Sequence, residues 1–250
     1  MIVYYAVGGG LGHLVRAARV IEKLGIDAVI ATASPYAERV CKSFIRVPQS
    51  LENDVSAHRD WIRELNAERI IADTFPGGIQ GELCGLDVPI DCVARLLRWD
   101  AYRAAVPFAL PRIGTTYVVE ELTHAVFGKV VPLDLSVPFV EEVEESDEWL
   151  VVHSGPDDEV RELTAFAKEL GARNLRVISG ADVWPAAPLF PAAAKIITAA
   201  GFNVMLETEQ WRAKHVAVPF ARRFDDQFVR AARRKKRLSS ANAPAPAAAM

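Results

Sequence analysis

Residues 200–227 read AGFNVMLETEQWRAKHVAVPFARRFDDQ, and the spacing within this stretch says most about the fold. Gly201 follows an apolar strand and opens a turn into a helical pattern that contains Glu207. Such a turn leaves backbone N–H groups available to a phosphate, and a carboxylate early in the helix can accept both hydroxyls of a ribose. The stretch therefore predicts a nucleotide-binding strand–turn–helix unit. Glu207 taken alone would more often be a solvated surface residue, and it is the spacing across three elements that favours a binding role.

The rest of the chain alternates short apolar runs with helical patterns, which is typical of parallel sheets covered on both faces. The predicted strands are 2–7, 28–32, 69–72, 88–93, 116–119, 149–153, 175–179, 195–198 and 215–218. The predicted helices are 14–24, 36–42, 54–66, 158–170, 205–212 and 224–237. Because the strand, glycine turn and helix pattern begins twice, we expect two α/β halves.

An acidic interruption at 141–148 separates the two halves, and a run of like charges is normally solvated. We therefore predict an amino-terminal domain at 1–140, a linker at 141–148 and a carboxyl-terminal domain at 149–238. The Ser/Ala/Pro-rich segment 239–250 is predicted to be a disordered tail. The basic run 233–237 before it is interpreted as a solvated helix end, with weak contact to an anionic membrane as the alternative.

The first glycine turn, Gly8 to Gly12, leads directly into His13. The dinucleotide fingerprint G-x-G-x-x-G fails here, because His13 stands where its third glycine would be, and no acidic residue ends the second strand. A Rossmann dehydrogenase is therefore disfavoured. An imidazole at the carboxyl end of the sheet is suited to removing a proton from a hydroxyl at neutral pH, while a helix-capping histidine is the alternative.

These motifs resemble the GT-B glycosyltransferases related to the enzyme that adds N-acetylglucosamine in peptidoglycan lipid synthesis. The matching positions are Gly201, Glu207, Pro219 and Gln227, together with the Gly-Leu-Gly-His-x-x-Arg motif from Gly10 to Arg16 found in a branch of bacterial predicted glycosyltransferases. The resemblance implies a GT-B fold, in which two Rossmann-like doubly wound α/β domains face each other across a cleft. The expected donor-binding residues are Gly10, Gly12, Arg16, Ser154, Gly155, Gly201, Asn203, Glu207 and Gln227.

The resemblance implies transfer of a sugar from a nucleotide-sugar, with UDP the commoner carrier, to a hydroxyl acceptor. His13 is expected to be the base and Asp73 to assist it, although a loop-capping role for Asp73 is as plausible. The acceptor is a small molecule or a lipid-linked one, and neither cofactor nor metal is expected. The alternatives are a UDP-sugar hydrolase of the flagellin-sugar type and a non-catalytic nucleotide-sugar-binding relic of the fold.

Composition limits the partners. A formal net charge of −3 gives no reason to expect nucleic-acid binding, and 51% hydrophobic with 24% charged residues is an ordinary globular composition. The apolar opening 1–7 is too short for a signal peptide. The three cysteines lack metal-ligand spacing, so we expect reduced thiols in a cytoplasmic protein.

Overall fold

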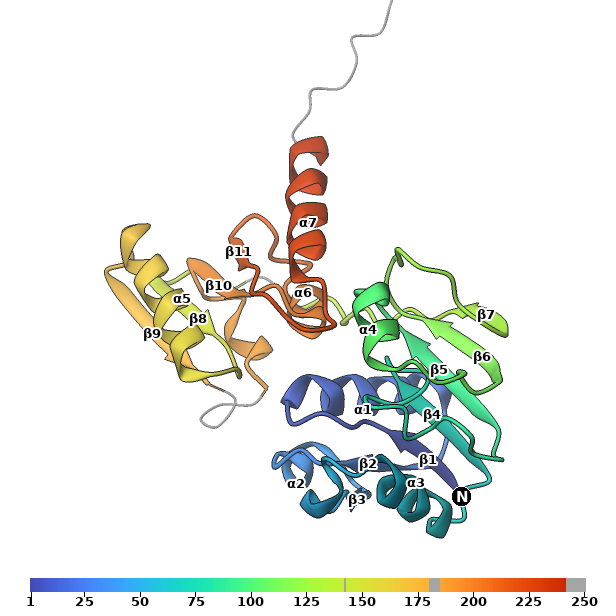
Figure 1. Cartoon of the computed structure of the whole chain (residues 1–250). Helices are drawn as coiled ribbons and strands as arrows, with labels where there is room; N and C mark the ends of the chain where they lie inside the picture. The colour runs from blue at the N-terminus through green and yellow to red at the C-terminus, as the bar shows by residue number, and fades with distance from the viewer. Residues whose placement is uncertain (142, 180–184, 242–250) are drawn as a thin grey trace, which may run out of the picture. The chain divides into compact units, whose positions relative to one another are not determined.

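The chain folds into two compact α/β units in the computed structural model (Figure 1), which describes residues 1–141, 143–179 and 185–241. Unit 1 comprises Met1–Ser136 together with Arg223–Asp225, and unit 2 comprises Val137–Arg222 and the chain from Asp226 onward. The predicted domain bounds, 1–140 and 149–238 with a linker at 141–148, stay a prediction. The structure adds that Arg223–Asp225 groups with unit 1.

Unit 1 contains a parallel sheet with the strand order β3-β2-β1-β4-β5-β6-β7. Its strands are β1 (Ile2–Tyr5), β2 (Ala28–Thr32), β3 (Phe44–Arg46), β4 (Arg69–Asp73), β5 (Ile90–Ala94), β6 (Ile113–Val118) and β7 (Lys129–Pro132). The central strands are rich in apolar side chains that are buried on both faces, as is typical of a parallel sheet. The order changes direction between β1 and β4, so the crevice of this doubly wound sheet opens at their carboxyl ends.

The helices of unit 1 are α1 (Leu11–Leu24), α2 (Ala37–Val40), α3 (Val55–Glu64) and α4 (Trp99–Ala105), with a short 3₁₀ helix, η1 (Gln49–Leu51). Helix α1 begins directly after Gly10 and ends at Gly25, whose φ of 61° is the left-handed conformation that glycine adopts without strain. The Asp54 carboxylate caps α3 by accepting the N–H of Ala57 at 2.9 Å. These boundaries place residue 13 in the first turn of α1.

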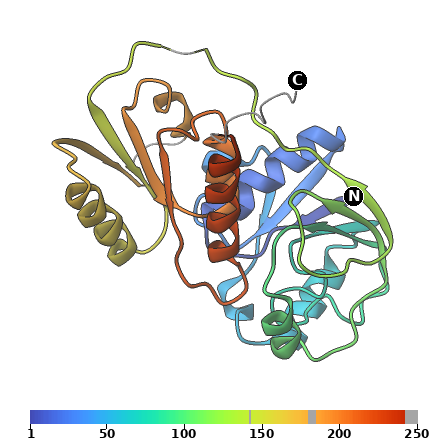
Figure 2. The same cartoon turned by 90° about the horizontal axis from the view of Figure 1, so that it is seen from above.

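Unit 2 contains a smaller parallel sheet with the order β11-β10-β8-β9. Its elements are β8 (Glu148–Val152), α5 (Asp157–Glu169), β9 (Asn174–Ile178), η2 (Ala187–Leu189), β10 (Lys195–Ala199), α6 (Phe202–Glu207), β11 (His215–Val218) and α7 (Gln227–Ala241). Helix α5 packs on β8 and β10, and α7, red in Figure 2, is one uninterrupted helix. The order changes direction between β8 and β10, which brings the loops after these two strands together.

Most predicted elements are confirmed, with shifts of a few residues at their ends. Three were missed because they are short: β3, β7 and α4. The predicted helix 205–212 is wrong in position, since α6 starts immediately after Gly201 and ends at Glu207. The predicted strand at 2–7 ends at Tyr5, and α1 begins three residues before the expected Leu14. Of the predicted tail, 239–241 belongs to α7, and 242–250 lies outside the described residues.

The basic run at 233–237 is only in part a solvated helix end. Arg234 is buried, and its guanidinium donates hydrogen bonds to the carbonyl oxygens of Met205 and Thr208 at the end of α6. A cation at this position satisfies carbonyl groups that have no partner within the helix and complements the helix dipole. Arg234 therefore attaches α7 to α6, whereas Lys235 and Lys236 are exposed.

The three cysteines are free thiols: Cys84 and Cys92 are buried, and Cys41 is half-buried. Burial raises the pKa of the Cys41 and Cys84 thiols, which keeps them protonated at neutral pH. Among the described residues, no helix combines the length and the apolar character needed to cross a membrane.

Candidate functional site

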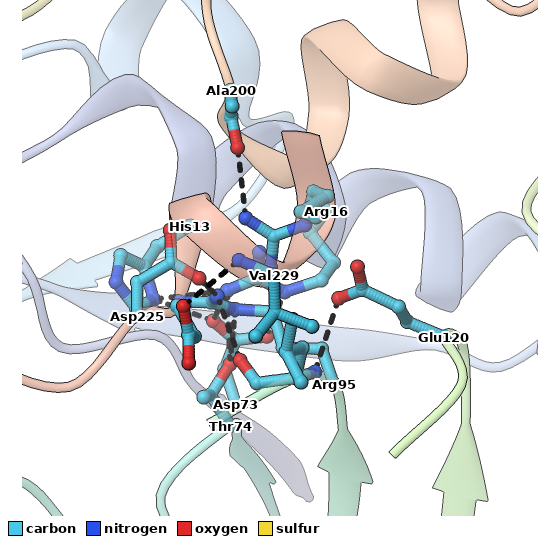
Figure 3. A network of polar contacts seen from close by, with 12 residues as sticks. His13, Arg16, Asp73, Thr74, Arg95, Glu120, Ala200, Asp225 and Val229 are labelled. Atoms are coloured by element: carbon cyan, nitrogen blue, oxygen red, sulfur yellow. Dashed lines mark hydrogen bonds and ion pairs between the residues drawn. The ribbon is translucent and has the colours of Figure 1, made fainter. Parts of the chain in front are cut away.

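The fold brings His13 and Asp73 into contact, although 60 positions separate them in the sequence. Asp73 is the last residue of β4, which pairs with β1, and His13 lies in the first turn of the helix that follows β1. Parallel neighbours end at the same edge of the sheet, so both side chains reach the crevice. The distance from Nδ1 of His13 to Oδ2 of Asp73 is 2.5 Å (Figure 3).

The Asp73 carboxylate is fully buried and has four hydrogen-bonding contacts. Arg16 donates to both of its oxygens, from Nε to Oδ1 at 2.7 Å and from Nη2 to Oδ2 at 2.5 Å, and Tyr4 donates its hydroxyl to Oδ1 at 3.0 Å. Burial alone would raise the pKa of Asp73, but the Arg16 guanidinium and the His13 hydrogen bond hold that pKa well below its ordinary value of 3.8. Asp73 is therefore a carboxylate at neutral pH.

Thr74 extends this network to Arg95 and Asp225. The Thr74 hydroxyl accepts one hydrogen bond from Arg16 and one from Arg95, each at 3.1 Å, and Arg95 is paired with Asp225. Thr74 has a φ of 73°, a conformation that is unfavourable for a β-branched residue, while its N–H still bonds to Val93. Strained backbone conformations of this kind are frequent at functional sites, where the surrounding contacts maintain them.

The ring of His13 is oriented by the glycine turn as well as by Asp73. Within the described part of the chain, the polar neighbours of the His13 ring lie at Nδ1: Oδ2 of Asp73 at 2.5 Å, and Nη2 of Arg16 at 3.3 Å, which can only donate and so makes no hydrogen bond to a protonated Nδ1. Because Asp73 is ionised, Nδ1 carries the proton and Nε2 is the nitrogen with a lone pair. Burial lowers the pKa of His13 below its ordinary 6.5, while the contact with Asp73 opposes that shift. The imidazole is therefore neutral near pH 7 and able to accept a proton.

Gly8 allows this position of the ring. A Cβ on Gly8 would lie 2.6 Å from Cδ2 and 2.8 Å from Nε2 of His13, so Gly8→Ala must displace the imidazole. If His13 is the base that the family resemblance implies, we expect Gly8→Ala to lower turnover by about 10²-fold, the usual result of misplacing a reacting group by about 1 Å. Gly9→Ala in the same turn is the matched control, since a Cβ there meets nothing within 4 Å. Steady-state kinetics of both variants decide this, and equal activities would show that the ring position does not matter.

Sequence reasoning missed Tyr4, Thr74 and Arg95. Tyr4 carried a weak signal, because a tyrosine in the middle of a buried strand needs a partner for its hydroxyl. Arg95 follows β5, whose neighbour in the sheet is β4, but only the strand order reveals that Arg95 lies beside Thr74. Of the predicted residues in this unit, Gly10 caps α1, Gly12 lies in its first turn, and Arg16 is buried on Asp73.

In unit 2, the predicted donor residues lie on the loops after β8 and β10 and on the helices α6 and α7. Gly201 is the N-cap of α6, Glu207 is its last residue, and Gln227 is the first residue of α7. The Gln227 side-chain oxygen accepts the N–H of Phe220 at 3.0 Å, which leaves its amide NH₂ for another partner. Arg230 donates to the carbonyl oxygen of Ala200 at 2.9 Å and so attaches α7 to the glycine turn.

The Ser154–Gly155 turn lies beside a histidine and a carboxylate. Nε2 of His153 is 2.7 Å from the Glu159 carboxylate, which also pairs with Arg222. A Cβ on Gly155 would lie 2.3 Å from Nε2 of His153, so the turn is packed closely against this ring. Helix α5 also begins with three acidic residues, which makes its N-terminus less attractive to a phosphate than that of α6.

No group of three or more His, Cys, Asp or Glu side chains within 1–141, 143–179 and 185–241 is arranged to hold a metal ion. The polar groups at the crevice of unit 1 are instead matched to each other, with two arginines balancing two aspartates. This arrangement can orient an imidazole and lower the cost of proton transfer.

Solved structures with the same fold are glycosyltransferases. Spinosyn rhamnosyltransferase SpnG, complexed with thymidine diphosphate, matches with a TM-score of 0.57 at 13% identity, over 96% of this chain and 85% of that one. LpCGTa in complex with UDP has a TM-score of 0.60 at 13% identity, over 94% and 82%. SsfS6, a glycosyltransferase of Streptomyces sp. SF2575, has a TM-score of 0.55 at 12% identity, over 96% and 85%.

The chain has the GT-B fold. The predicted fold class is thereby confirmed, and the predicted resemblance to GT-B glycosyltransferases is confirmed at the level of the fold. The sequence matches no protein-family model and no curated protein. The closer relationship to the peptidoglycan enzyme and the motif-level assignments stay predictions.

Proposed function

We propose that this protein is a glycosyltransferase that moves a sugar from a nucleotide-sugar to a hydroxyl acceptor, with His13 as the base. The observation that carries the proposal is the 2.5 Å contact of His13 with a buried, ionised Asp73 at the crevice of a GT-B fold. A carboxylate on Nδ1 fixes the tautomer and leaves Nε2 to accept a proton, as in other His–Asp pairs that activate hydroxyls.

The proposed reaction is one displacement. Nε2 of His13 removes the proton of the acceptor hydroxyl, and the oxygen forms a bond to the anomeric carbon of the donor. The bond from that carbon to the phosphate oxygen breaks, and the nucleoside diphosphate leaves with the electron pair. Asp73 stabilises the imidazolium that forms, since it already holds the proton on Nδ1.

We assign the donor nucleotide to unit 2. Gly201 presents the N-terminal end of α6, which has no acidic residue in its first turn, to the diphosphate, with Asn203 beside it. Glu207 is proposed to bind the ribose hydroxyls, and the amide NH₂ of Gln227 a further hydroxyl of the donor. Ser154 and Gly155 have a lesser role in this proposal, because carboxylates crowd the start of α5.

Glu207→Ala tests the donor assignment. Losing charge-assisted hydrogen bonds to ribose costs about 1.5–3 kcal/mol, so we expect the dissociation constant for the free nucleoside diphosphate to rise by about 10- to 100-fold. Calorimetric titration with UDP and with thymidine diphosphate measures this. Glu209→Ala, which removes a carboxylate two residues further on, is the control and is expected to bind normally. Unchanged affinity of Glu207→Ala would remove the ribose assignment.

The activity itself is tested by incubating the protein with UDP- and thymidine-diphosphate-linked sugars, with and without a panel of hydroxyl acceptors. Release of the diphosphate only when an acceptor is present supports transfer. Release in water alone would identify a hydrolase, and binding without turnover would identify a non-catalytic binding protein. A hexose as the transferred sugar and a metal-independent reaction are further parts of the proposal, which the family resemblance supports. A cytoplasmic setting is also proposed, and the three free cysteines support it.

A further inference from the structure

The charges around His13 are arranged in a way that the proposed reaction does not by itself explain. A histidine that contacts a buried carboxylate normally gains a proton, because the negative charge stabilises the imidazolium. A base that is already protonated cannot accept the proton of an acceptor. Asp73 would therefore hinder His13 at neutral pH if it acted alone.

Arg16 changes this balance. It donates two hydrogen bonds to the Asp73 carboxylate, one to each oxygen, and the two side chains are 3% and 0% exposed. A guanidinium keeps its charge at every relevant pH, and in a buried site its attraction to the carboxylate is weakly screened. The Arg16–Asp73 pair therefore has no net charge, and His13 contacts this neutral ion pair rather than an isolated carboxylate.

Burial and a second cation act on His13 in the same direction as Arg16. Arg95, which follows β5, is a second cation near the imidazole, and burial penalises the charged ring. Phe75, after β4, contributes an aromatic face 6.2 Å from the imidazole, centroid to centroid. Tyr4 on β1 bonds to Oδ1 of Asp73, the oxygen that does not contact His13. Asp225 pairs with Arg95 and partly offsets the charge of that second cation, just as Asp73 pairs with Arg16.

We propose that Arg16 is a positioning residue that neutralises Asp73 and thereby keeps His13 in its neutral, proton-accepting form. The two hydrogen bonds from the Arg16 guanidinium also hold the Asp73 carboxylate with Oδ2 toward Nδ1 of His13. A further hydrogen bond from Arg16 to the Thr74 hydroxyl, at 3.1 Å, fixes the guanidinium itself. Arg16 lies one helical turn after His13, at i+3, so the two side chains lie on the same face of α1. The catalytic meaning of this arrangement rests on the proposed function, whereas the charge state of His13 does not.

An NMR titration of the histidine rings in the full chain tests the charge state without any turnover. Five histidines are present, and His13→Gln identifies the signal of residue 13. In the wild type, the pKa of His13 is expected below 6.5, as burial, Arg16 and Arg95 require. Arg16→Gln leaves Asp73 unneutralised, so the His13 pKa is expected to rise above 6.5. A wild-type pKa above 6.5, or no rise in the variant, would overturn the proposal.

Two further variants keep the test decisive. Arg69→Gln removes another arginine that pairs with a buried carboxylate of this sheet, Asp91, and is expected to leave the His13 titration unchanged. If Arg16→Gln fails to fold, Arg16→Lys serves in its place, because it keeps the cation and loses the fork. The His13 pKa is then expected to stay below 6.5 with a measurable loss of turnover, and a rise above 6.5 despite the retained cation would contradict the assignment.

The pH dependence of turnover links the two proposals. In Arg16→Gln, the acid limb of the kcat/KM profile is expected to move to higher pH by the same shift that NMR measures. If no donor is turned over by any variant while the titrations behave as described, the proposed function fails and the role of Arg16 stands. If turnover is present and its acid limb does not move, the role of Arg16 fails and the function stands.

Discussion

His13→Ala is expected to lose turnover by about 10²- to 10⁴-fold, the usual contribution of a general base, with almost no change in affinity for the donor nucleotide. In the proposed mechanism the imidazole acts on the acceptor proton in the transition state, whereas the nucleotide is assigned to residues of unit 2. The measurement is a pair of experiments: steady-state kinetics with the best donor and acceptor, and calorimetric titration with the free nucleoside diphosphate.

His58→Gln is the control for this variant. His58 is a buried histidine of the same unit, where Nε2 contacts the Tyr5 hydroxyl at 2.9 Å, and it does not contact Asp73. Losing it is expected to cost stability and to leave kcat/KM close to the wild type once folding is verified. If His13→Ala retained full turnover, a different group would have to be the base, and the His13–Asp73 contact would be structural only.

Asp73→Asn is expected to have a double effect. The amide can present its NH₂ group to Nδ1 and so stabilise the wrong tautomer of His13, which predicts a loss of turnover on the order of 10³- to 10⁴-fold. It also leaves the Arg16 charge buried without a carboxylate, and breaking a buried pair in this way costs about 3–5 kcal/mol in the free energy of unfolding. Denaturant unfolding and kinetics measure the two effects separately.

The other buried carboxylate of the sheet provides the matched control. Asp91→Asn removes a carboxylate that accepts the N–H of Thr115 at 2.7 Å and pairs with Arg69, whose side chain is 40% exposed. We expect a smaller loss of stability, because the remaining arginine reaches water, and no loss of turnover. Equal losses of turnover in both variants would mean that unfolding, rather than the tautomer of His13, explains the effect of Asp73→Asn.

The effect of Asp73→Asn on stability is expected to depend on pH. The folded-state pKa of Asp73 lies below its ordinary 3.8, so its contribution to stability is complete above pH 3.8 and is lost as the pH falls from 3.8 toward the folded-state pKa. Asp73→Asn has no titrating group there. The stability difference between wild type and variant should therefore shrink in acid, as unfolding measured at a series of pH values below 3.8 would show.

The sheets could be predicted because most strands are short runs rich in apolar residues, and β2 (Ala28–Thr32) and the edge strand β11 (His215–Val218) are predicted to the residue. Burial on both faces makes such runs continuous and easy to see. The strand β7 (Lys129–Pro132) has only four residues, and its side chains are largely exposed, so it lacks the buried apolar run that marks the central strands. Helix α4 was missed because two turns are too few to show a period.

The role of Arg16 illustrates what the pattern of residues could not decide. By resemblance it was expected to bind the donor, yet the guanidinium is buried on Asp73 and Thr74. An arginine three residues after His13 on a helix could point its guanidinium either toward a donor or toward Asp73, so its spacing does not distinguish the two roles. The structure favours a positioning role, whereas Gly201, Glu207 and Gln227 keep their proposed donor contacts until binding is measured.

Local features could be read from the order of the residues, because the strands, the helices and the two glycine turns follow from periodicity along the chain. The GT-B fold was expected because the spacing from Gly201 to Gln227 resembles that family. The contact between Asp73 and His13 could not be read from the order of the residues, because it depends on β4 lying beside β1 in the folded sheet. The charge states of both groups likewise depend on the fold, since burial and the Arg16 cation shift their pKa values.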